Sequence, residues 1–325
     1  MDYSEIFTET DVIVLGDLIM DQFIYGEPAR ISREAPVLIL DENDRKINPG
    51  GAGNAALNIS ALGGNTELIS LAGNDNCWES LKQTLEDHDI STAGMIVDKN
   101  IQTAVKTRIM AGSDQVVRQQ VVRIDKVKNT GKKLSADSLN NIKNYIKSII
   151  SRIDALLFSD YGLGLLSQEL IDSIISLCKK NGIPVIADSR YGLLNFNNVT
   201  IATPNLEEAG RAAGMELSGN DEIISAGKKI LNKISSDYLL LTRGKNGMTL
   251  FYDERGYDHI PVVNQKEVYD VTGAGDTVAA ALVLGLGAGL DVLKSVKIAN
   301  SAASIAVTKE GAAPVYLEEL IEVVS

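Results

Sequence analysis

Two carboxylates near the C-terminal end of the sequence, Asp270 and Asp276, bracket a turn of small residues, Gly273, Ala274 and Gly275. A long run of apolar and small residues follows at once, which predicts a helix that begins at this turn. The first amides of a helix lack carbonyl partners and lie at the positive end of its dipole, so they bind anions. A carboxylate at the edge of an anion site is costly unless it has a task, so Asp276 is a candidate catalytic group. The alternative is that Asp276 caps the helix.

Asp17 and Asp21 follow the apolar run 11–16, which predicts a strand buried on both faces. In open α/β sheets, ligands bind at the carboxyl ends of the strands, which makes both carboxylates candidate ligand contacts. A pair of turn-forming aspartates is an equally good interpretation of these residues alone.

Gly50 and Gly51 stand immediately before a segment rich in Ala, Leu and Ile that predicts a helix. Glycine permits close backbone approach and unusual dihedral angles, so this turn is either a flexible start to the helix or a hinge that contacts a ligand. Asn54, which follows this turn, offers both a donor and an acceptor to a hydroxyl group.

The segments 22–48 and 101–125 depart from the strand–helix alternation of the rest of the chain. The first has strand-like runs separated by prolines, and the second alternates like two strands around a turn at 112–114. Together they predict a small sheet that acts as a lid over the main domain. Lys106 and Arg108 share one face of it because they lie two residues apart in a strand. Such a pair could bind a phosphate, but more commonly it lies on a solvent-exposed face of a sheet.

From residue 134 onward, strand-like and helix-like segments alternate. The predicted strands are 155–158, 184–187, 200–203 and 238–241, and the predicted helices are 135–152, 167–181 and 220–234. With the strands 11–16 and 66–71, this pattern predicts an α/β fold with a doubly wound, mostly parallel sheet flanked by helices. We expect one domain over residues 1–325. Polar residues gather after the strands, at Asp188, Asn205, Glu208, Thr242 and Gly244.

The composition excludes several classes of function. A net charge of −12 argues against a nucleic-acid-binding face. Two cysteines in unlike contexts and only two histidines argue against a disulfide framework, a zinc site and a His-based triad. Neither a Walker A pattern nor a well-placed dinucleotide-binding glycine pattern occurs. No signal peptide or membrane span is recognisable, which predicts a cytoplasmic protein.

The candidate residues suit phosphoryl transfer. That reaction needs positioning, charge neutralisation and one carboxylate that accepts the proton of the acceptor hydroxyl, rather than a histidine or cysteine nucleophile. The amides of the turn 273–275 would hold the transferred phosphoryl group while Asp276 orients and deprotonates the hydroxyl. A lid would exclude water, which competes as an acceptor.

The sequence resembles the ribokinase-like (PfkB-type) carbohydrate kinases. Residues 270–277 resemble one signature of that family and residues 50–54 resemble the other, in the family's order and spacing over essentially the whole chain. The resemblance implies a sugar kinase that uses ATP and Mg²⁺, with Asp276 as catalytic base and the turn 273–275 as anion hole. It implies sugar contacts at Asp17, Asp21, Gly50, Gly51 and Asn54, contacts to Mg²⁺ and phosphates at Asn205 and Glu208, nucleotide contacts at Thr242, Gly244 and Asn300, and a K⁺ site at Asp270.

A narrower resemblance is to the D-glycero-D-manno-heptose-7-phosphate kinases, carried by residues 16–17, 30–37, 106–108 and 115–118. That family converts heptose 7-phosphate into heptose 1,7-bisphosphate on the route to ADP-heptose and the lipopolysaccharide core. The resemblance implies that Lys106 and Arg108 hold the substrate's phosphate, with Asp188 and Arg190 completing the pocket. The chain departs from the pattern where it has Arg33 instead of Pro and Gly53 instead of Ala.

Three hypotheses follow. The chain is a heptose-phosphate kinase, another kinase of this fold that acts on ribose, fructose, a fructose phosphate or a nucleoside, or a non-catalytic sugar- or nucleotide-binding regulator. The intact Asp276 and its glycine turn disfavour the regulator. We expect a small sugar or sugar phosphate as partner, and neither nucleic acid nor membrane. Exposed strand edges in the lid predict a homodimer through the lid.

Overall fold

The computed structural model describes residues 3–112, 118–127, 134–252, 256–263 and 269–324. Its larger sheet has eight strands in the order β14-β13-β12-β11-β10-β9-β1-β4. These strands are β1 (Asp11–Gly16), β4 (Asn65–Ile69), β9 (Ala155–Asp160), β10 (Val185–Ser189), β11 (Ile201–Ala202), β12 (Tyr238–Thr242), β13 (Met248–Phe251) and β14 (Tyr257–Ile260). Neighbours from β4 to β12 pair in parallel, whereas β13 and β14 are antiparallel at one edge.

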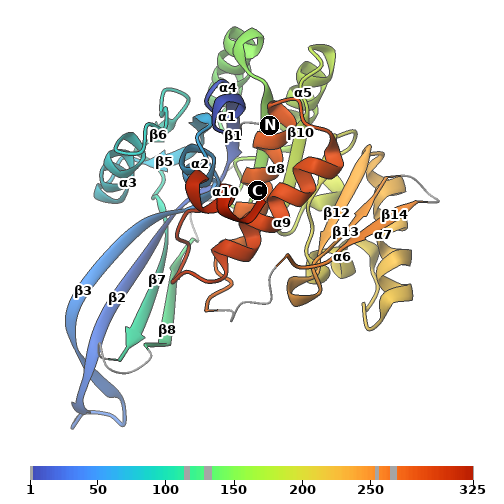
Figure 1. Ribbon diagram of the computed structural model, residues 1–325. Coiled ribbons are helices and arrows are strands. Elements are labelled where there is room, and N and C mark those ends of the chain that lie inside the picture. Colours follow the sequence, from blue (N-terminus) through green and yellow to red (C-terminus); the bar gives the residue numbers. More distant parts are fainter. Residues whose placement is uncertain (1–2, 113–117, 128–133, 253–255, 264–268, 325) are drawn as a thin grey trace.

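Helices cover both faces of this sheet (Figure 1). One face packs against α2 (Ala52–Ala61), α8 (Ala274–Gly287), α9 (Val292–Ala306) and α10 (Leu317–Val324), and the other against α4 (Ala136–Ile149), α5 (Gln168–Lys180), α6 (Leu206–Ala213) and α7 (Asn220–Ile234). In β1, Val12 and Val14 enter one core while Ile13 and Leu15 enter the other. A strand buried on both faces is continuously apolar, which is why β1 was recognisable. The predicted α/β fold with a doubly wound, mostly parallel sheet is confirmed.

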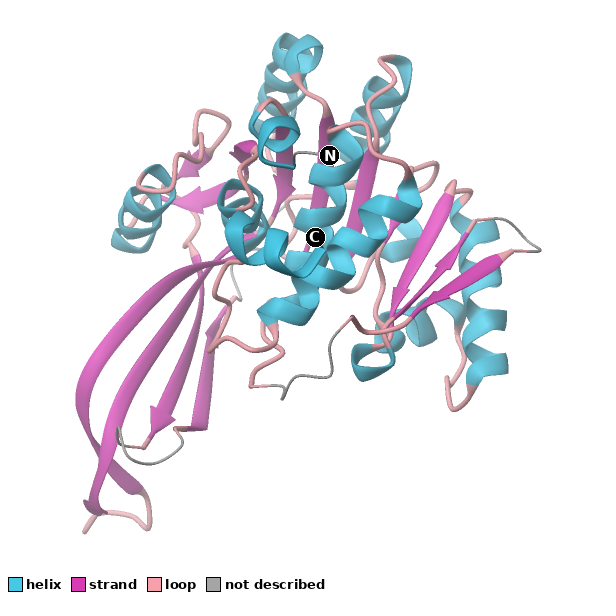
Figure 2. Cartoon of the chain, viewed as in Figure 1, coloured by secondary structure: helices cyan, strands magenta, loops and turns pink. Residues whose placement is uncertain are grey.

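A four-stranded sheet, here called the small sheet, has the order β3-β2-β7-β8 and projects from the body of the molecule (Figures 1 and 2). Its strands are β2 (Leu18–Ile31), β3 (Leu38–Gly51), β7 (Ala104–Ala111) and β8 (Gln119–Lys126). They arise from the two segments expected to form a lid. β2 continues through Pro28 because its register with β3 shifts between Pro28 and Arg30. In the predicted 112–114 turn, Ser113 and Asp114 lie outside the described residues, as does Gln115.

The small sheet is connected directly to the main sheet. β1 ends at Gly16 and β2 begins at Leu18, so Asp17 alone separates them. β3 ends at Gly51, and the amide of Ala52, the first residue of α2, donates to the carbonyl of Asp17 at 3.0 Å. The base of the small sheet, the start of α2 and the carboxyl end of β1 therefore meet at one residue.

The structure differs from the prediction at three places. The strand predicted over 66–71 divides, because β4 ends at Ile69 and β5 (Leu71–Gly73) pairs instead with β6 (Ile96–Asp98), beside α3 (Asn76–Glu86). The helix α6 was not predicted, although its first turn carries a capping box of Asn205 and Glu208. The short helix α1 (Tyr3–Thr8) was not predicted either.

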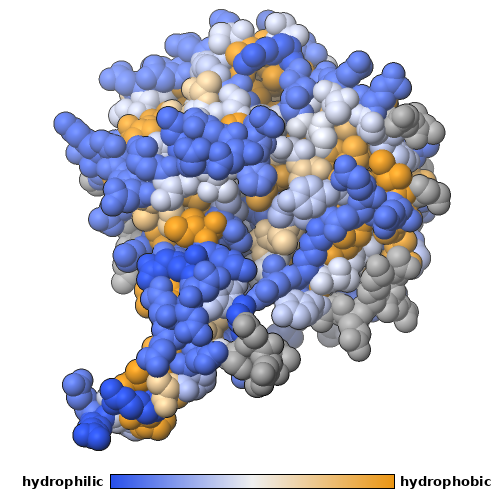
Figure 3. Space-filling view, turned by 60° about the vertical axis from the view of Figure 1, so that its left-hand side comes forward, coloured by the Kyte–Doolittle hydropathy of each residue, from blue (hydrophilic) through white to orange (hydrophobic). Residues whose placement is uncertain are grey.

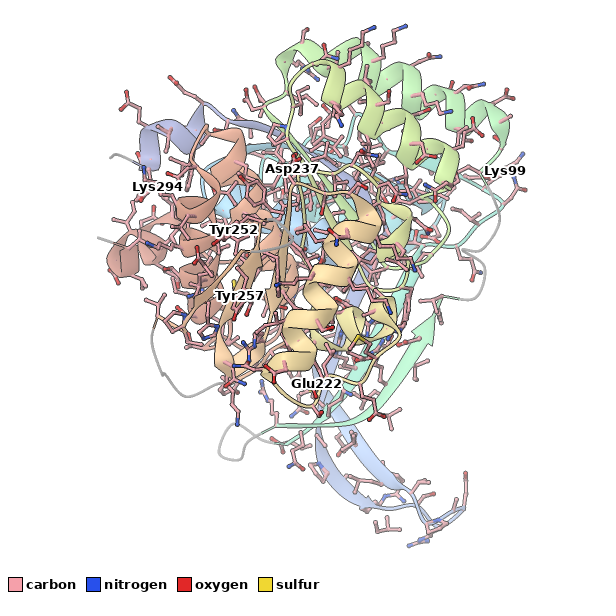
Figure 4. The ribbon with its side chains drawn as sticks, turned by 90° about the vertical axis from the view of Figure 1, so that its right-hand side faces the viewer. Lys99, Glu222, Asp237, Tyr252, Tyr257 and Lys294 are labelled. Atoms are coloured by element: carbon pink, nitrogen blue, oxygen red, sulfur yellow. The ribbon has the colours of Figure 1, made fainter. Side chains whose placement is uncertain are left out.

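An antiparallel pair, β13 and β14, forms the edge of the sheet. Tyr252 and Tyr257 mark this pair in Figure 4, and Glu222 marks the first turn of α7, which packs beside it. Residues 253–255, between these two strands, are outside the part that the structure describes. Across the described ranges, no helix is long and apolar enough to cross a membrane.

The close packing at this junction can be tested by substitution of Gly51. Its φ is +59°, and a Cβ here would overlap the carbonyl oxygen of Asp17. Gly182 has a φ of +72°, but a Cβ there would meet no atom within 4 Å. We expect Gly182→Ala to destabilise the fold by about 1–2 kcal/mol, the cost of the left-handed backbone. Gly51→Ala should add about 1–3 kcal/mol of overpacking to that cost. Urea unfolding measures both, and equal losses would contradict the close approach to Asp17.

Candidate functional site

Asp276 lies in the first turn of α8 and is only 4 % exposed. Asn54 Nδ2 donates to its Oδ2 at 2.7 Å, and the Tyr161 hydroxyl donates to its Oδ1 at 2.7 Å. Asn54 belongs to α2 and Tyr161 follows β9, so three distant parts of the chain meet at this carboxylate. Asp276 thus accepts its hydrogen bonds from other elements, rather than capping its own helix.

Asn58, one turn further along α2, fixes the direction of the Asn54 amide. Asn58 Nδ2 donates to Asn54 Oδ1 at 3.3 Å, while Asn58 Oδ1 accepts from the hydroxyl of Thr277 and the amide of Val315. Asn54 therefore presents its nitrogen, not its oxygen, to Asp276. The amide predicted to contact a sugar hydroxyl makes contacts within the protein on both sides, and its contact with a sugar stays a prediction.

Asp17 holds the loop that carries Tyr161. Its Oδ2 accepts from the backbone amides of Tyr161 at 2.9 Å and Leu163 at 3.0 Å. Burial raises the pKa of Asp17 to about 6, against the effect of these amides. Tyr161 was missed by sequence reasoning. Its position directly after β9, at the sheet edge that holds the other candidates, was the available signal.

Burial raises the pKa of Asp276 to about 6, and the hydrogen bonds from Asn54 and Tyr161 oppose this rise. The nearby charge of Asp21 raises the pKa further, whereas that of Lys106 lowers it. Such a carboxyl group is ionised at neutral pH, yet it is more basic than an exposed aspartate. It is therefore suited to accept a proton from a hydroxyl in a transition state.

The turn before α8 is open on one side. Gly273 caps the helix with a φ of +79°, a conformation that favours glycine. The amide of Ala274 donates to the carbonyl of Val271 at 3.3 Å, whereas no carbonyl in the described ranges accepts from the amides of Gly275 or Asp276. A Cβ at Gly275 would meet no atom within 4 Å. Of the turn predicted to bind an anion, Gly275 therefore has the amide best placed for a ligand.

Asp21 and Arg108 form a buried ion pair at the base of the small sheet. Arg108 Nη1 lies 2.5 Å from Asp21 Oδ1, and the two side chains are 12 % and 9 % exposed. A Cβ at Gly50 would overlap Asp21 Oδ2, so Gly50 makes room for this carboxylate. The positive charge of Arg108, predicted to hold a phosphate, is compensated within the protein.

Lys106 faces the same cluster from β7. Its Nζ lies 4.7 Å from the centre of the Tyr161 ring, in a cation–π arrangement. No ion pair joins it to a carboxylate of the described residues. Burial lowers the pKa of Lys106, Asp21 opposes this, and Arg123, Arg190 and Arg108 lower it further. Lys106 is thus a cation close to Asp276 that forms no ion pair with a described carboxylate.

Asp188 and Glu208 are neighbouring carboxyl groups at the end of β10 and the start of α6. Asp188 Oδ1 accepts from the Thr203 hydroxyl at 3.0 Å. Burial raises the pKa of Asp188 well above its ordinary value, and the charges of Asp276 and Glu208 add to this rise. Burial also raises the pKa of Glu208, whose carboxylate accepts from the amide of Asn205 in the capping box. A cation near the pair would relieve their repulsion.

The residues predicted to contact the nucleotide lie in two places. Thr242 ends β12 and forms a β-bridge with Asn205, and Gly244 follows with a φ of +54°. Asn300, on α9, donates from Nδ2 to the carbonyl of Pro261 at 2.7 Å. It lines a cleft of about 520 Å³ together with residues 260–263.

Asp270, predicted to belong to a monovalent-cation site, joins two loops. Its carboxylate accepts from the amide and hydroxyl of Thr272 and from the amide of Gly311. These bonds hold the turn before α8 against the loop after α9. Cation binding at this residue stays a prediction.

Known proteins resemble this chain over nearly its whole length. Residues 9–319 match the family model described as pfkB family carbohydrate kinase. Two relatives are called bifunctional protein HldE. The one from Citrifermentans bemidjiense is 35 % identical over 322 residues, and the one from Trichlorobacter lovleyi is 37 % identical over 315 residues. These matches cover 98 % and 96 % of this chain but 64 % and 62 % of the relatives, so the chain spans less than two thirds of their length.

Solved structures share the fold. The ribokinase of Arabidopsis thaliana complexed with ribose and ATP aligns with a TM-score of 0.75 at 19 % identity, over 97 % of this chain and 98 % of its own. Phosphofructokinase-2 from Escherichia coli in complex with potassium aligns with a TM-score of 0.77 at 20 % identity, over 97 % of each chain. At these identities the likeness establishes the fold alone, which is ribokinase-like.

Tyr161→Phe should raise the pKa of Asp276 above about 6, because it removes one of the two hydrogen bonds that oppose the effect of burial. A ¹³C NMR titration of the Asp276 carboxyl group, assigned with Asp276→Asn, measures the change. Tyr145→Phe is the matched control, since it removes a hydroxyl that donates to Glu67 elsewhere in the molecule. A pKa that stays the same or falls in Tyr161→Phe would show that this hydroxyl does not stabilise the carboxylate.

Proposed function

Because the chain belongs to the pfkB family of carbohydrate kinases, we propose that the cluster around Asp276 transfers the γ-phosphoryl group of ATP to a hydroxyl of D-glycero-D-manno-heptose 7-phosphate. The chain is a phosphotransferase with an alcohol group as acceptor. The narrower assignment is supported by relatives called HldE and by the cations around Lys106, which suit an acceptor that already carries a phosphate. The product would be heptose 1,7-bisphosphate.

The observation that carries the proposal is a buried carboxylate, Asp276, held between two donors beside the open amide of Gly275. In the proposed mechanism Asp276 accepts the proton of the acceptor hydroxyl. The hydroxyl oxygen forms a bond to the γ-phosphorus as the bond from that phosphorus to ADP breaks. The amides of Gly275 and Asp276 stabilise the negative charge of the phosphoryl group in transit. Asn54 and Tyr161 keep the carboxylate in place.

Mg²⁺ is expected to accompany ATP in this family. The described residues contain no group of three or more His, Cys, Asp or Glu side chains placed to hold a metal. The mutual repulsion of Asp188 and Glu208 suits a Mg²⁺ ion bound mainly by phosphates and waters, with one or two carboxylates nearby. When bound, this ion neutralises phosphate charge.

We propose K⁺ as a further ion near Asp270. Phosphofructokinase-2 from Escherichia coli, which shares the fold, is known in complex with potassium. Asp270 joins the two loops whose carbonyl groups would have to hold such an ion.

Release of ADP with ATP, Mg²⁺ and a panel of sugars tests the function. We expect heptose 7-phosphate to give a higher kcat/KM than ribose or fructose 6-phosphate. Asp276→Asn keeps the shape of the side chain but cannot accept the proton, so kcat should fall by about 10²–10⁴-fold.

Two outcomes would contradict parts of this proposal. If no sugar on the panel stimulates ADP release above the rate of Asp276→Asn, the chain is not a sugar kinase of this kind. If ribose or fructose 6-phosphate is preferred, the kinase mechanism stands and the heptose assignment is wrong.

We also propose that two copies associate through the small sheet. The small sheet and the loop between β2 and β3 carry six apolar side chains that are between 45 % and 61 % exposed, namely Ile31, Val37, Leu38, Val121, Val122 and Ile124. Figure 3 shows the small sheet projecting from the body, with hydrophobic side chains at its far end. Among the described strands, β8 has a neighbour in the sheet on one side only, and such an edge favours pairing with another chain.

Light scattering after size exclusion should therefore report a dimer. The double substitution of Val122 and Ile124 by Lys should give a monomer, because it places charge in the apolar contact. Val97→Lys is the matched control, since Val97 is 44 % exposed but lies on β6, outside the small sheet. A monomeric wild type, or a dimer that persists in the double variant, would contradict association through this surface.

A further inference from the structure

We propose that Lys106, Arg123 and Arg190 form the seat for the phosphate that the sugar already carries, and that Arg108 instead positions Asp21. This inference rests on the proposed function, because it requires a phosphorylated acceptor. The resemblance implied Lys106 and Arg108 with Asp188 and Arg190, whereas the set proposed here keeps Lys106 and Arg190 and takes Arg123 in place of Arg108.

Arg108 is poorly suited to bind a substrate phosphate. Its guanidinium contacts the carboxylate of Asp21 at 2.5 Å, and both side chains are almost buried. An anion that reached this guanidinium would meet the negative charge of Asp21 at the same place. Breaking the pair would also leave Asp21 buried without a partner, which is strongly unfavourable. The pairing of Arg108 is therefore a means of holding Asp21 beside Gly50.

Arg123 lies on the same face of the small sheet as Lys106 and Arg108. The β7–β8 register places it directly opposite Arg108, and opposite residues of paired strands share a face. Its Nε and Nη2 each donate to Asp125 at 2.7 Å, and the two side chains are 37 % and 35 % exposed. A guanidinium has five N–H donors, so Asp125 orients Arg123 and leaves donors for a ligand.

Arg190 approaches from the main body. It follows β10, and its guanidinium lies 5.8 Å from the centre of the Tyr191 ring. No carboxylate of the described ranges forms an ion pair with it. Arg190, Tyr191 and Arg211 line a cavity of about 180 Å³. The charges of Arg123 and Arg190 both act on Lys106, so cations from the small sheet and from the main body lie near one another.

The charges in this seat match those of a phosphate monoester. Such a group carries about −1.5 to −2 charges at neutral pH. Lys106 and Arg190 supply two positive charges that form no ion pair with a carboxylate of the described residues, in a chain whose net charge is −12. Arg123 adds a fork of donors that suits phosphate oxygens. A bound phosphate would relieve the repulsion among these cations and would join the small sheet to the main body.

Kinetics with two acceptors, heptose 7-phosphate and heptose without phosphate, tests the seat. The quantity of interest is the ratio of the two kcat/KM values. Arg123→Gln and Arg190→Gln should each lower this ratio by about 10–100-fold. Arg108→Gln should lower both kcat/KM values by similar factors, because Asp21 loses its partner. Arg45→Gln, which removes a similar arginine–carboxylate pair with Glu42 elsewhere on the small sheet, should change neither value.

If the ratio falls in Arg108→Gln but not in Arg123→Gln or Arg190→Gln, the seat is assigned to the wrong residues. Arg190→Lys and Arg123→Lys, which keep the charge, should restore part of the ratio, whereas a purely structural defect would lower both acceptors alike. Thermal unfolding verifies that each variant is folded.

If the wild type phosphorylates neither acceptor, the proposed function fails, and the seat is then tested by binding of inorganic phosphate. A ³¹P NMR titration should give a Kd about tenfold higher in Arg123→Gln and Arg190→Gln than in the wild type or Arg45→Gln. Equal affinity in all four proteins would overturn the seat.

Discussion

A carboxylate that is almost completely buried needs hydrogen bonds from the protein, because burial of a charged group without them is strongly unfavourable. Asp276 receives them from Asn54 and Tyr161, which are 222 and 115 residues away in the sequence. Each donor is itself held by a second residue, Asn54 by Asn58 and the loop of Tyr161 by Asp17. The site therefore depends on the packing of α2 and α8 on one face of the sheet and on the loop that follows β9.

The small sheet is attached at the same edge of the main sheet, because Asp17 alone links β1 to β2. That junction places Asp21 and Lys106 near Asp276, where their opposite charges act on its pKa in opposite directions. Asp21 forms an ion pair with Arg108, whereas Lys106 lies over the Tyr161 ring and forms no ion pair with a carboxylate of the described residues. In the proposed complex, a substrate phosphate would supply the missing negative charge and bring the small sheet and the body together around the acceptor.

Much of the fold was predictable because its strands are buried on both faces and read as continuous apolar runs, as in β1. The turn at Gly273–Gly275 was recognisable because glycines directly before an apolar helix leave backbone amides open to an anion. The role of Tyr161 was not predictable, since its hydroxyl acts on a residue that only the tertiary fold brings near. The pairing of Arg108 with Asp21 was not predictable for the same reason. Local spacing placed Arg108 on the right face but could not identify its partner.

The central claim is that Asp276 accepts the proton of the sugar hydroxyl. The pH dependence of kcat/KM tests it most directly, with wild type and Tyr161→Phe compared under the same conditions. Activity requires the ionised carboxylate, so the wild type should lose activity as the pH falls below about 6. In Tyr161→Phe this loss should occur at higher pH. Ionisation of the substrate is common to both proteins and cannot produce the shift. An acidic limb at the same pH in both proteins would contradict the claim.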